Sequence, residues 1–155
     1  MRIILLGYGK MGKVIEGIAL ERGHDIVARV DETNRAELTA YSADTADVVI
    51  EFSHPDAAVQ NLTDCLTLGL PVVCGTTGWL DHWSKIEALC REKVGAFFYA
   101  SNYSIGVNLF FRLNRTLARL MAHQPQYRVT MTETHHIHKK DAPSGTALTL
   151  AEGVM

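Results

Sequence analysis

The sequence predicts an α/β protein with a doubly wound parallel sheet, followed by the start of an α+β region. Two observations support this prediction. Short apolar runs alternate with helix-like stretches through most of the chain, and after Asn102 a long helix-like stretch leads into a β-branched segment. Strands that alternate with helices pair in parallel and are covered on both faces. We therefore expect a doubly wound α/β domain over residues 1–104 and part of a second domain over residues 105–155.

The expected elements follow one another in a regular order. Apolar residues at helical spacing, such as Met11, Val14 and Ile18, predict the first helix, which ends at Gly23. The expected strands are residues 2–6, 26–30, 48–52, 72–74 and 96–100. The expected helices are residues 10–22, 56–68, 79–92 and 106–121. This order is typical of repeated strand-helix-strand units.

The last third of the chain is less regular. Residues 127–136 alternate and are rich in β-branched side chains, which predicts an antiparallel-type strand, and Ser144 is placed to cap a final helix. One strand cannot form a sheet alone, because its backbone groups stay unpaired. We therefore expect that further strands follow Met155 or that the segment pairs with another chain.

Composition argues against several classes of protein. Of the 155 residues, 47% are hydrophobic and 21% charged, and the formal net charge of -2 gives no electrostatic reason to expect nucleic acid or an anionic membrane as partner. No stretch approaches the roughly 20 apolar residues that a membrane span requires. Cys65, Cys74 and Cys90 lack CxxC spacing and lie among apolar residues, so we expect reduced thiols. These features predict a cytoplasmic protein.

A glycine-rich turn follows the first predicted strand. Gly7, Gly9 and Gly12 form a GxGxxG motif that opens the first helix, and Asp31 follows the second strand about 20 residues later. In this motif the first glycine permits a tight turn, the second lets the backbone approach a pyrophosphate, and the third lets helix and strand pack closely. The register of strand, glycines, helix and acid predicts a Rossmann-type site for a nicotinamide dinucleotide. A glycine-rich turn without a ligand is the alternative.

The sequence leaves the choice of dinucleotide open. Asp31 would accept hydrogen bonds from the ribose hydroxyls and repel a 2′-phosphate, which favours NAD(H), whereas Arg29 and Arg35 could bind that phosphate. Asp31 could also be only a solvated turn residue. We therefore expect NADH, NADPH or both as the cofactor.

Two further loops follow predicted strands, at the edge where a parallel sheet binds its ligands. Residues 75–78 (GTTG) could turn amides and hydroxyls toward the nicotinamide, and residues 100–103 (ASNY) follow the fifth strand. Taken singly, each loop is more often an ordinary turn and helix cap.

The densest group of polar residues is the segment 133–146, ETHHIHKKDAPSGT. Its histidines suit proton delivery near neutral pH, and a neighbouring lysine could supply a fixed positive charge or a second proton. Ser144 as a helix N-cap would present amides to an anion such as a substrate carboxylate. The segment therefore predicts acid catalysis beside an anion-binding site.

A zinc site is the competing interpretation of this segment, because His-His-x-His can bind zinc. In a strand, however, His135 points to one side and His136 with His138 to the other, so at most two of them converge. No cysteine or carboxylate stands at a recognisable ligand spacing with them. We therefore expect no metal. Histidines exposed on a strand beside an ordinary helix cap are the remaining alternative.

Along its whole length the chain resembles the 4-hydroxy-tetrahydrodipicolinate reductases, also called dihydrodipicolinate reductases. The resemblance rests on GYGKMG at 7–12, EFSHP at 51–55, GTTG at 75–78, ASNYSIGVN at 100–108 and ETHHIHKKDAPSGTA at 133–147. It implies reduction of 4-hydroxy-tetrahydrodipicolinate to tetrahydrodipicolinate by NADH or NADPH, in lysine and diaminopimelate biosynthesis. In that family C4 of a cyclic, conjugated imine dicarboxylate takes a hydride and C3 is then protonated. The resemblance also implies a homotetramer built through the sheet of the second domain.

The same resemblance implies roles for individual residues. The acid histidine falls on His135 and a lysine acid on Lys139, while the contacts to the substrate carboxylates fall on His136, Gly145 and Thr146. The implied cofactor contacts are Gly7, Tyr8, Gly9, Lys10, Met11, Gly12, Asp31, Gly75, Thr76, Thr77, Ala100, Ser101, Asn102 and Tyr103.

The sequence also departs from the family. The glycine turn is one residue shorter than the usual GxxGxMG, and Ile137 stands where many members have a polar or basic residue. The stretch 32–44 is also short, which implies that a helix on the cofactor side is missing. Family chains continue well past Met155. Two other functions stay open. Another dehydrogenase of amino-acid metabolism should lack the 133–147 segment. A non-catalytic NAD(H)-sensing module would have no use for that segment.

Overall fold

The computed structural model describes residues 1–137 and 142–155. The described chain forms two compact units, Met1–Ala100 and Ser101–Met155. Each unit has its own packing, and each contains a different part of the sequence motifs.

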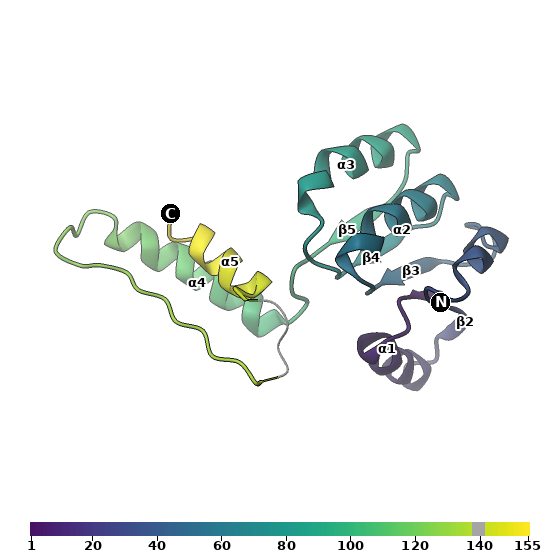
Figure 1. Cartoon of the computed structure of the whole chain (residues 1–155), viewed down its shortest axis with the longest axis horizontal. Helices are drawn as coiled ribbons and strands as arrows, with labels where there is room; N and C mark the ends of the chain where they lie inside the picture. The colour runs from purple at the N-terminus through teal and green to yellow at the C-terminus, as the bar shows by residue number, and fades with distance from the viewer. Residues whose placement is uncertain (138–141) are drawn as a thin grey trace. The chain divides into compact units, whose positions relative to one another are not determined.

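The first unit is built on a five-stranded parallel sheet with the strand order β2-β1-β3-β4-β5 (Figure 1). The strands are β1 (Arg2–Leu6), β2 (Asp25–Val30), β3 (Val48–Glu51), β4 (Val72–Cys74) and β5 (Phe97–Tyr99). Each agrees with a predicted strand to within one residue at either end. Because β2 lies on one side of β1 and β3 on the other, the winding direction changes there, and a crevice is expected at the carboxyl ends of β1 and β3. The predicted doubly wound parallel sheet is confirmed.

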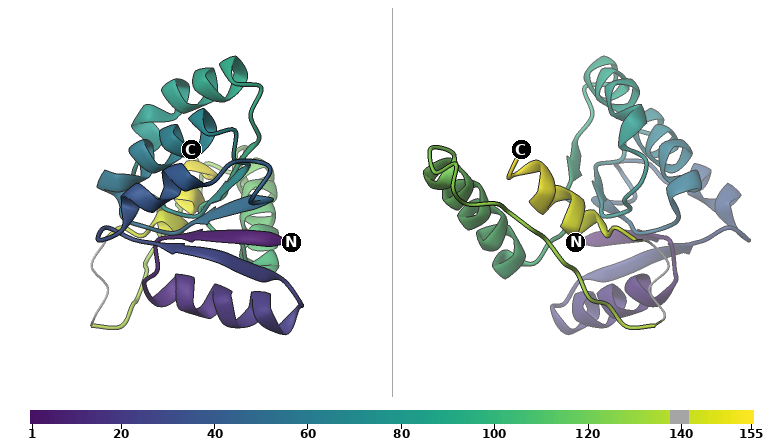
Figure 2. Two further views of the ribbon diagram at one scale, coloured as in Figure 1. Left: turned by 90° about the vertical axis from the view of Figure 1, so that its right-hand side faces the viewer. Right: turned by 60° about the vertical axis from the view of Figure 1, so that its left-hand side comes forward.

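Helices cover both faces of the sheet. They are α1 (Lys10–Glu21), α2 (Pro55–Thr67) and α3 (Trp83–Glu92), with the 3-10 helices η1 (Arg35–Ala40) and η2 (Leu80–His82). The helix α1, purple in Figure 2, lies on one face of the sheet, and α2 with α3 lies on the other. The helix predicted over 79–92 thus begins as a 3-10 turn, and η1 stands where the short connection after β2 implied a missing helix.

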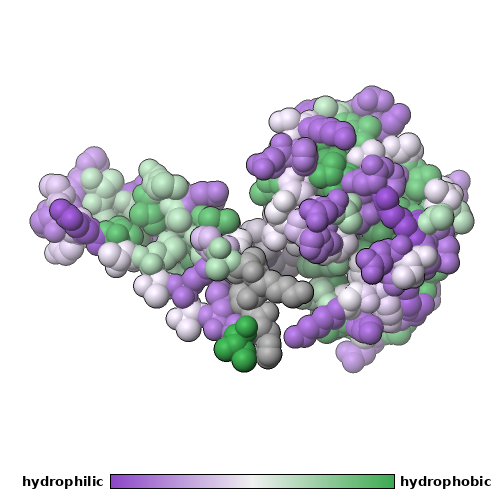
Figure 3. Space-filling view, in the orientation of Figure 1, coloured by the Kyte–Doolittle hydropathy of each residue, from purple (hydrophilic) through white to green (hydrophobic). Residues whose placement is uncertain are grey.

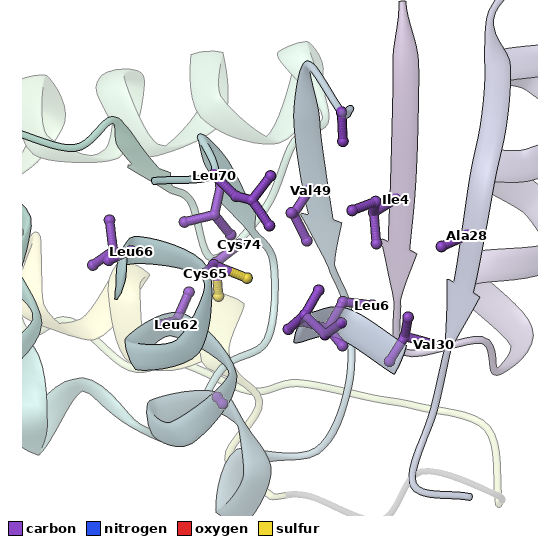
Figure 4. Close-up of a cluster of buried hydrophobic side chains, with 14 of the residues drawn as sticks. Ile4, Leu6, Ala28, Val30, Val49, Leu62, Cys65, Leu66, Leu70 and Cys74 are labelled. Atoms are coloured by element: carbon purple, nitrogen blue, oxygen red, sulfur yellow. The ribbon is translucent and has the colours of Figure 1, made fainter. Parts of the chain in front are cut away.

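The larger of the two cores lies between the sheet and α2 (Figure 4). Ile4 and Leu6 of β1 and Leu62 of α2 all belong to this core, and these three side chains are at most 2% exposed. The alternate residues Ile3 and Leu5 point to the opposite face and pack beneath α1. Successive side chains of a strand point to opposite faces, and both faces are covered here, which explains why all four buried residues of β1, at positions 3–6, are apolar.

The second unit contains α4 (Ile105–Met121) and α5 (Gly145–Glu152). The two helices touch where the Asn114 side-chain amide donates a hydrogen bond of 2.8 Å to the carbonyl oxygen of Leu150. Phe111 of α4 is buried, whereas Leu109, Leu113 and Leu117, spaced four residues apart, are each more than half exposed. Apolar surface is correspondingly visible over this unit in Figure 3. Within the described residues no helix is long and apolar enough to span a membrane.

The strand predicted over residues 127–136 is wrong. These residues run as an irregular connection between α4 and α5 (Figure 1). A β-branched segment becomes a strand only by exchanging hydrogen bonds with a neighbouring strand, and the described part of the second unit offers none.

The core of the first unit supports a stability prediction. Replacing Leu62, which is fully buried, by alanine removes core contacts and leaves a cavity, so we expect the free energy of unfolding to fall by about 3 kcal/mol. Leu20 of α1 is 53% exposed, and its replacement by alanine should change that free energy by less than about 0.5 kcal/mol. Urea titration followed by tryptophan fluorescence measures both values. Equal losses for the two variants would contradict the described core.

Candidate functional site

The three glycines of the turn after β1 have different surroundings. Gly7 has a φ of +99°, and a Cβ there would lie 2.1 Å from the carbonyl oxygen of Phe52. A Cβ on Gly12 would lie 2.4 Å from the carbonyl oxygen of Gly7, so α1 packs directly on the turn. A Cβ on Gly9 would meet nothing within 4 Å. The first and third glycines are therefore required by the fold, and the second leaves an open side that a ligand can approach.

A cavity of about 520 Å³ opens at the carboxyl ends of β1, β2 and β3, where the winding direction changes. Its lining residues are Leu6, Gly7, Tyr8, Gly9, Asp31, Glu32, Thr33, Arg35, Phe52, Ser53, His54, Ala57 and Asn61. The predicted contacts Gly7, Tyr8, Gly9 and Asp31 therefore meet in one cavity, which we call the first pocket.

A second pocket of about 350 Å³ adjoins the first. Its lining residues are Gly9, Lys10, Met11, Phe52, Ser53, Pro55, Gly75, Thr76 and Thr77. Gly9, Phe52 and Ser53 line both pockets, so the two form one groove across the edge of the sheet. A Cβ on Gly75 would lie 2.1 Å from the Phe52 ring, which explains why the loop after β4 begins with glycine. The fold brings the predicted cofactor contacts of the first unit together at this groove, with two exceptions. Ala100 lines neither pocket, and Gly12 packs against the backbone of the glycine turn.

Asp31 lies at the rim of the first pocket as a carboxylate. Its Oδ1 accepts hydrogen bonds from the hydroxyl and the backbone N–H of Thr33, at 2.6 and 2.8 Å. Both bonds lower the pKa of the Asp31 carboxyl, and the bond from the Thr33 hydroxyl has the larger effect. The group is therefore ionised at neutral pH. Asp31 is thus both a turn residue and a charged acceptor facing the pocket.

Both arginines considered for a 2′-phosphate are engaged by carboxylates. Arg29 donates from Nε to Glu16 at 2.7 Å, and the same carboxylate accepts a hydrogen bond from the Tyr8 hydroxyl. Arg29 and, second, Tyr8 lower the pKa of Glu16. Arg35 forms an ion pair with Asp64.

A buried polar cluster beneath the groove was missed by the sequence analysis. Glu51, at the end of β3, is fully buried and accepts hydrogen bonds from Ser53, Asn61 and Cys74. Ser53 and Asn61 also line the first pocket, and the backbone N–H of Ser53 donates to the Thr76 hydroxyl at 2.8 Å. The only signal in the sequence was an acidic residue closing an apolar strand. Two effects raise the pKa of the Cys74 thiol: burial is the larger, and the nearby Glu51 is the second. The thiol therefore acts as a neutral donor.

In the second unit a glutamate joins two predicted site residues. Glu133 Oε2 lies 2.9 Å from Nε2 of His135 and 2.7 Å from the Ser144 hydroxyl, and Glu133 Oε1 accepts the Ser144 backbone N–H at 2.9 Å. Ser144 in turn caps α5 by accepting from the Ala147 N–H at 3.1 Å, as predicted. Glu133 thus ties His135 to the end of α5 where Gly145 and Thr146 begin the helix, a role that sequence reasoning missed.

The other predicted site residues are His136, Lys139 and residues 100–103. His136 is exposed, and Lys139 lies outside the described residues. Ala100 belongs to the first unit, whereas Ser101, Asn102 and Tyr103 begin the second. Asn102 Oδ1 accepts the Ser104 N–H at 2.8 Å, so this loop also prepares the start of α4.

The described residues contain no group of three or more His, Cys, Asp or Glu side chains placed to hold a metal ion. The three cysteines, all within the described part of the chain, form no disulfide, as predicted. Burial raises the pKa of the Cys65 thiol to about 12.

The parallel sheet, the glycine turn and the groove define a nucleotide-binding protein of the Rossmann class. Comparison with protein families narrows this class. The family model for dihydrodipicolinate reductase, N-terminus, matches residues 1–103, and the one for dihydrodipicolinate reductase, C-terminus, matches residues 106–155. The chain belongs to the dihydrodipicolinate reductase family.

Individual relatives agree with this assignment. The chain is 47% identical over 156 aligned residues to the 4-hydroxy-tetrahydrodipicolinate reductase of Christiangramia forsetii, covering 100% of this chain and 64% of the relative. A solved structure, dipicolinate-bound dihydrodipicolinate reductase from Paenisporosarcina sp. TG-14, has the same fold, with a TM-score of 0.69 and 24% identity. That comparison covers 99% of this chain and 65% of the solved one. The chain thus spans about two thirds of the length of these relatives.

The glycine turn yields a test with a matched control inside α1. Gly12→Ala places a methyl group against a backbone oxygen that cannot yield, so we expect a loss of about 2 kcal/mol or more in the free energy of unfolding. Gly17→Ala meets nothing within 4 Å and should gain about 0.5–1 kcal/mol from the better helix propensity of alanine. Chemical denaturation measures both. A stable Gly12→Ala variant would contradict the close packing of α1 on the turn.

Glu133 yields a test by titration. The Ser144 hydroxyl, His135 and the Ser144 amide lower the pKa of Glu133 from 4.5 to about 2. A carboxyl whose pKa falls on folding stabilises the structure above its unfolded pKa, and that contribution is lost as the pH falls from about 4.5 to about 2. We expect the Ser144 amide resonance in NMR spectra to titrate with a midpoint near the lower value. Glu133→Gln should abolish this titration, and a midpoint near 4.5 would contradict the contact.

Proposed function

We propose that these residues belong to an enzyme that reduces 4-hydroxy-tetrahydrodipicolinate to tetrahydrodipicolinate with NADH or NADPH. One observation carries the proposal: the same chain holds a Rossmann-type groove and a histidine tied by a carboxylate to the N-terminus of a helix. Membership of the family and 47% identity to a reductase over the whole chain support it.

The first unit fits a nicotinamide dinucleotide. The open side of Gly9 at the start of α1 allows the pyrophosphate to approach the helix amides, and Asp31 can accept hydrogen bonds from ribose hydroxyls. The second pocket, lined by Gly75, Thr76 and Thr77, adjoins the first and suits the nicotinamide end of the dinucleotide. The loop 100–103 is proposed to complete that end. The bound dinucleotide supplies a hydride to C4 of the substrate ring.

His135 is proposed as the acid of the reaction. Elimination of water removes the 4-hydroxyl together with a proton from C3, and once C4 has then accepted the hydride, C3 is electron-rich and needs one proton. The His135 imidazolium donates that proton to C3 and becomes a neutral imidazole. Glu133, 2.9 Å from Nε2, fixes the orientation of the ring. Lys139 is proposed as a further acid on the basis of the family pattern.

The start of α5 is proposed to bind a substrate carboxylate. Gly145 and Thr146 lie in its first turn, where backbone amides point out of the helix, and His136 adds a donor. The dipicolinate bound by the solved family member is a dicarboxylate of this kind. We further propose a cytoplasmic homotetramer, in which the second unit contributes to assembly.

A substitution at His135 tests the acid role. His135→Gln should lower turnover by about 100-fold or more while the Kd for NADH changes by less than about twofold. Turnover is measured as NADH or NADPH oxidation with freshly made dihydrodipicolinate-synthase product. His123→Gln, at an exposed position after α4, is the matched control and should keep full activity.

Three outcomes would overturn the proposal. Unchanged turnover in His135→Gln would refute the acid role. Oxidation of NADH with other amino-acid-pathway substrates, and not with the synthase product, would indicate a different dehydrogenase. Dinucleotide binding without turnover of any substrate would indicate a sensing module.

A further inference from the structure

We infer that the groove selects NAD(H) over NADP(H), because Asp64 and Asn61 hold the Arg35 guanidinium in an intramolecular ion pair and hydrogen bond while Asp31 and Glu32 leave the pocket rim acidic. This inference rests on the proposed dinucleotide site and adds its cofactor preference. It concerns five side chains, of which Asp31, Glu32, Arg35 and Asn61 line the first pocket at the end expected to hold the adenosine ribose.

The rim of the pocket carries two adjacent carboxylates. Asp31 and Glu32 follow β2 directly and both line the first pocket. Asp31 is kept ionised by its bonds from Thr33, and Glu32 is exposed. A 2′-phosphate carries close to two negative charges at neutral pH, so it would be repelled at this rim. A 2′-hydroxyl can instead donate a hydrogen bond to a carboxylate.

Arg35 is the one arginine among the residues that line the first pocket. Its Nη2 pairs with Asp64, and its Nε donates to Asn61 Oδ1 at 3.2 Å. Asp64 is itself held, since its Oδ1 accepts a hydrogen bond of 2.7 Å from Gln60. The charge that could attract a phosphate is therefore already compensated and fixed by α2.

Asn61 cannot easily release Arg35, because a buried cluster fixes its amide. Its Nδ2 donates to Glu51 Oε1 at 3.3 Å and to the Ser53 hydroxyl at 3.0 Å, and the residue is 3% exposed. Both partners need the N–H side of the amide, so the oxygen side is left facing Arg35. The position of Arg35 thus depends on the buried Glu51 as well as on an ion pair at the surface.

The other nearby arginine is compensated in the same way. Arg29 pairs with Glu16 through Nε and Nη2, and its guanidinium lies 5.9 Å from the centre of the Tyr8 ring. Moving it to a phosphate would break the ion pair and leave the Glu16 carboxylate with the Tyr8 hydroxyl as its remaining donor. Neither arginine is available to a 2′-phosphate without leaving a carboxylate unpaired.

Separate titrations of NADH and NADPH into the protein test the inference. We expect the Kd for NADPH, followed by tryptophan quenching or calorimetry at low salt, to be at least about tenfold higher than that for NADH. NADPH binding as tight as NADH, or tighter, would overturn the inference and leave the proposed reductase intact. Binding of neither dinucleotide would overturn the proposed function and this inference with it.

Two substitutions identify the side chains responsible. Asp64→Asn keeps the shape of the side chain and removes the charge that compensates Arg35, so the Kd for NADPH should fall by about threefold or more while that for NADH changes by less than about twofold. Glu32→Gln, at an exposed position, should act in the same direction without a risk to folding. Glu87→Gln removes the carboxylate of a comparable pair with Arg91 on α3 and should change neither Kd. A ratio of the two Kd values that stays at the wild-type value in both Asp64→Asn and Glu32→Gln would overturn the assignment.

Discussion

At the carboxyl end of β3 a fully buried glutamate, Glu51, is satisfied by three neutral donors, the hydroxyl of Ser53, the amide of Asn61 and the thiol of Cys74. An ionised or strongly polar group in a core is tolerated only when its hydrogen-bonding capacity is filled. The donors come from the loop after β3, from α2 and from β4. Satisfying one carboxylate therefore fixes the loop after β3, the helix α2 and the end of β4 relative to one another beneath the groove.

This constraint extends to the surface of the groove. The Asn61 amide, fixed by Glu51 and Ser53, presents its oxygen to Arg35, and Arg35 is paired with Asp64. The glycine turn sets the opposite side, because α1 can reach β1 only if Gly12 has no side chain. The groove is thus bounded by close backbone packing on one side and by a hydrogen-bonded polar cluster on the other. Ligand recognition is built on contacts that also stabilise the sheet.

Much of the fold could be predicted from the sequence, since it depends on local periodicity. A strand covered on both faces is apolar over most of its length, and this made β1 and β3 recognisable although Arg2 begins the one and Glu51 ends the other. The strand predicted over 127–136 failed for the opposite reason. Its pattern was local, but a strand exists only through a neighbour, and the described second unit provides α4 and α5 instead. The same unit leaves Leu113 and Leu117 of α4 largely exposed.

The sequence by itself determined the glycine turn, Asp31, the loop at Gly75 and the capping of α5 by Ser144, because each depends on residues close together in the chain. Only the tertiary structure decided what surrounds them. The pairing of Arg35 with Asp64, the burial of Glu51 beside Cys74, and the link from Glu133 to both His135 and Ser144 join residues whose meeting no spacing rule predicts. Charge and polarity can be read from a sequence, but whether a charge is compensated depends on which side chains folding places within a few ångströms of it.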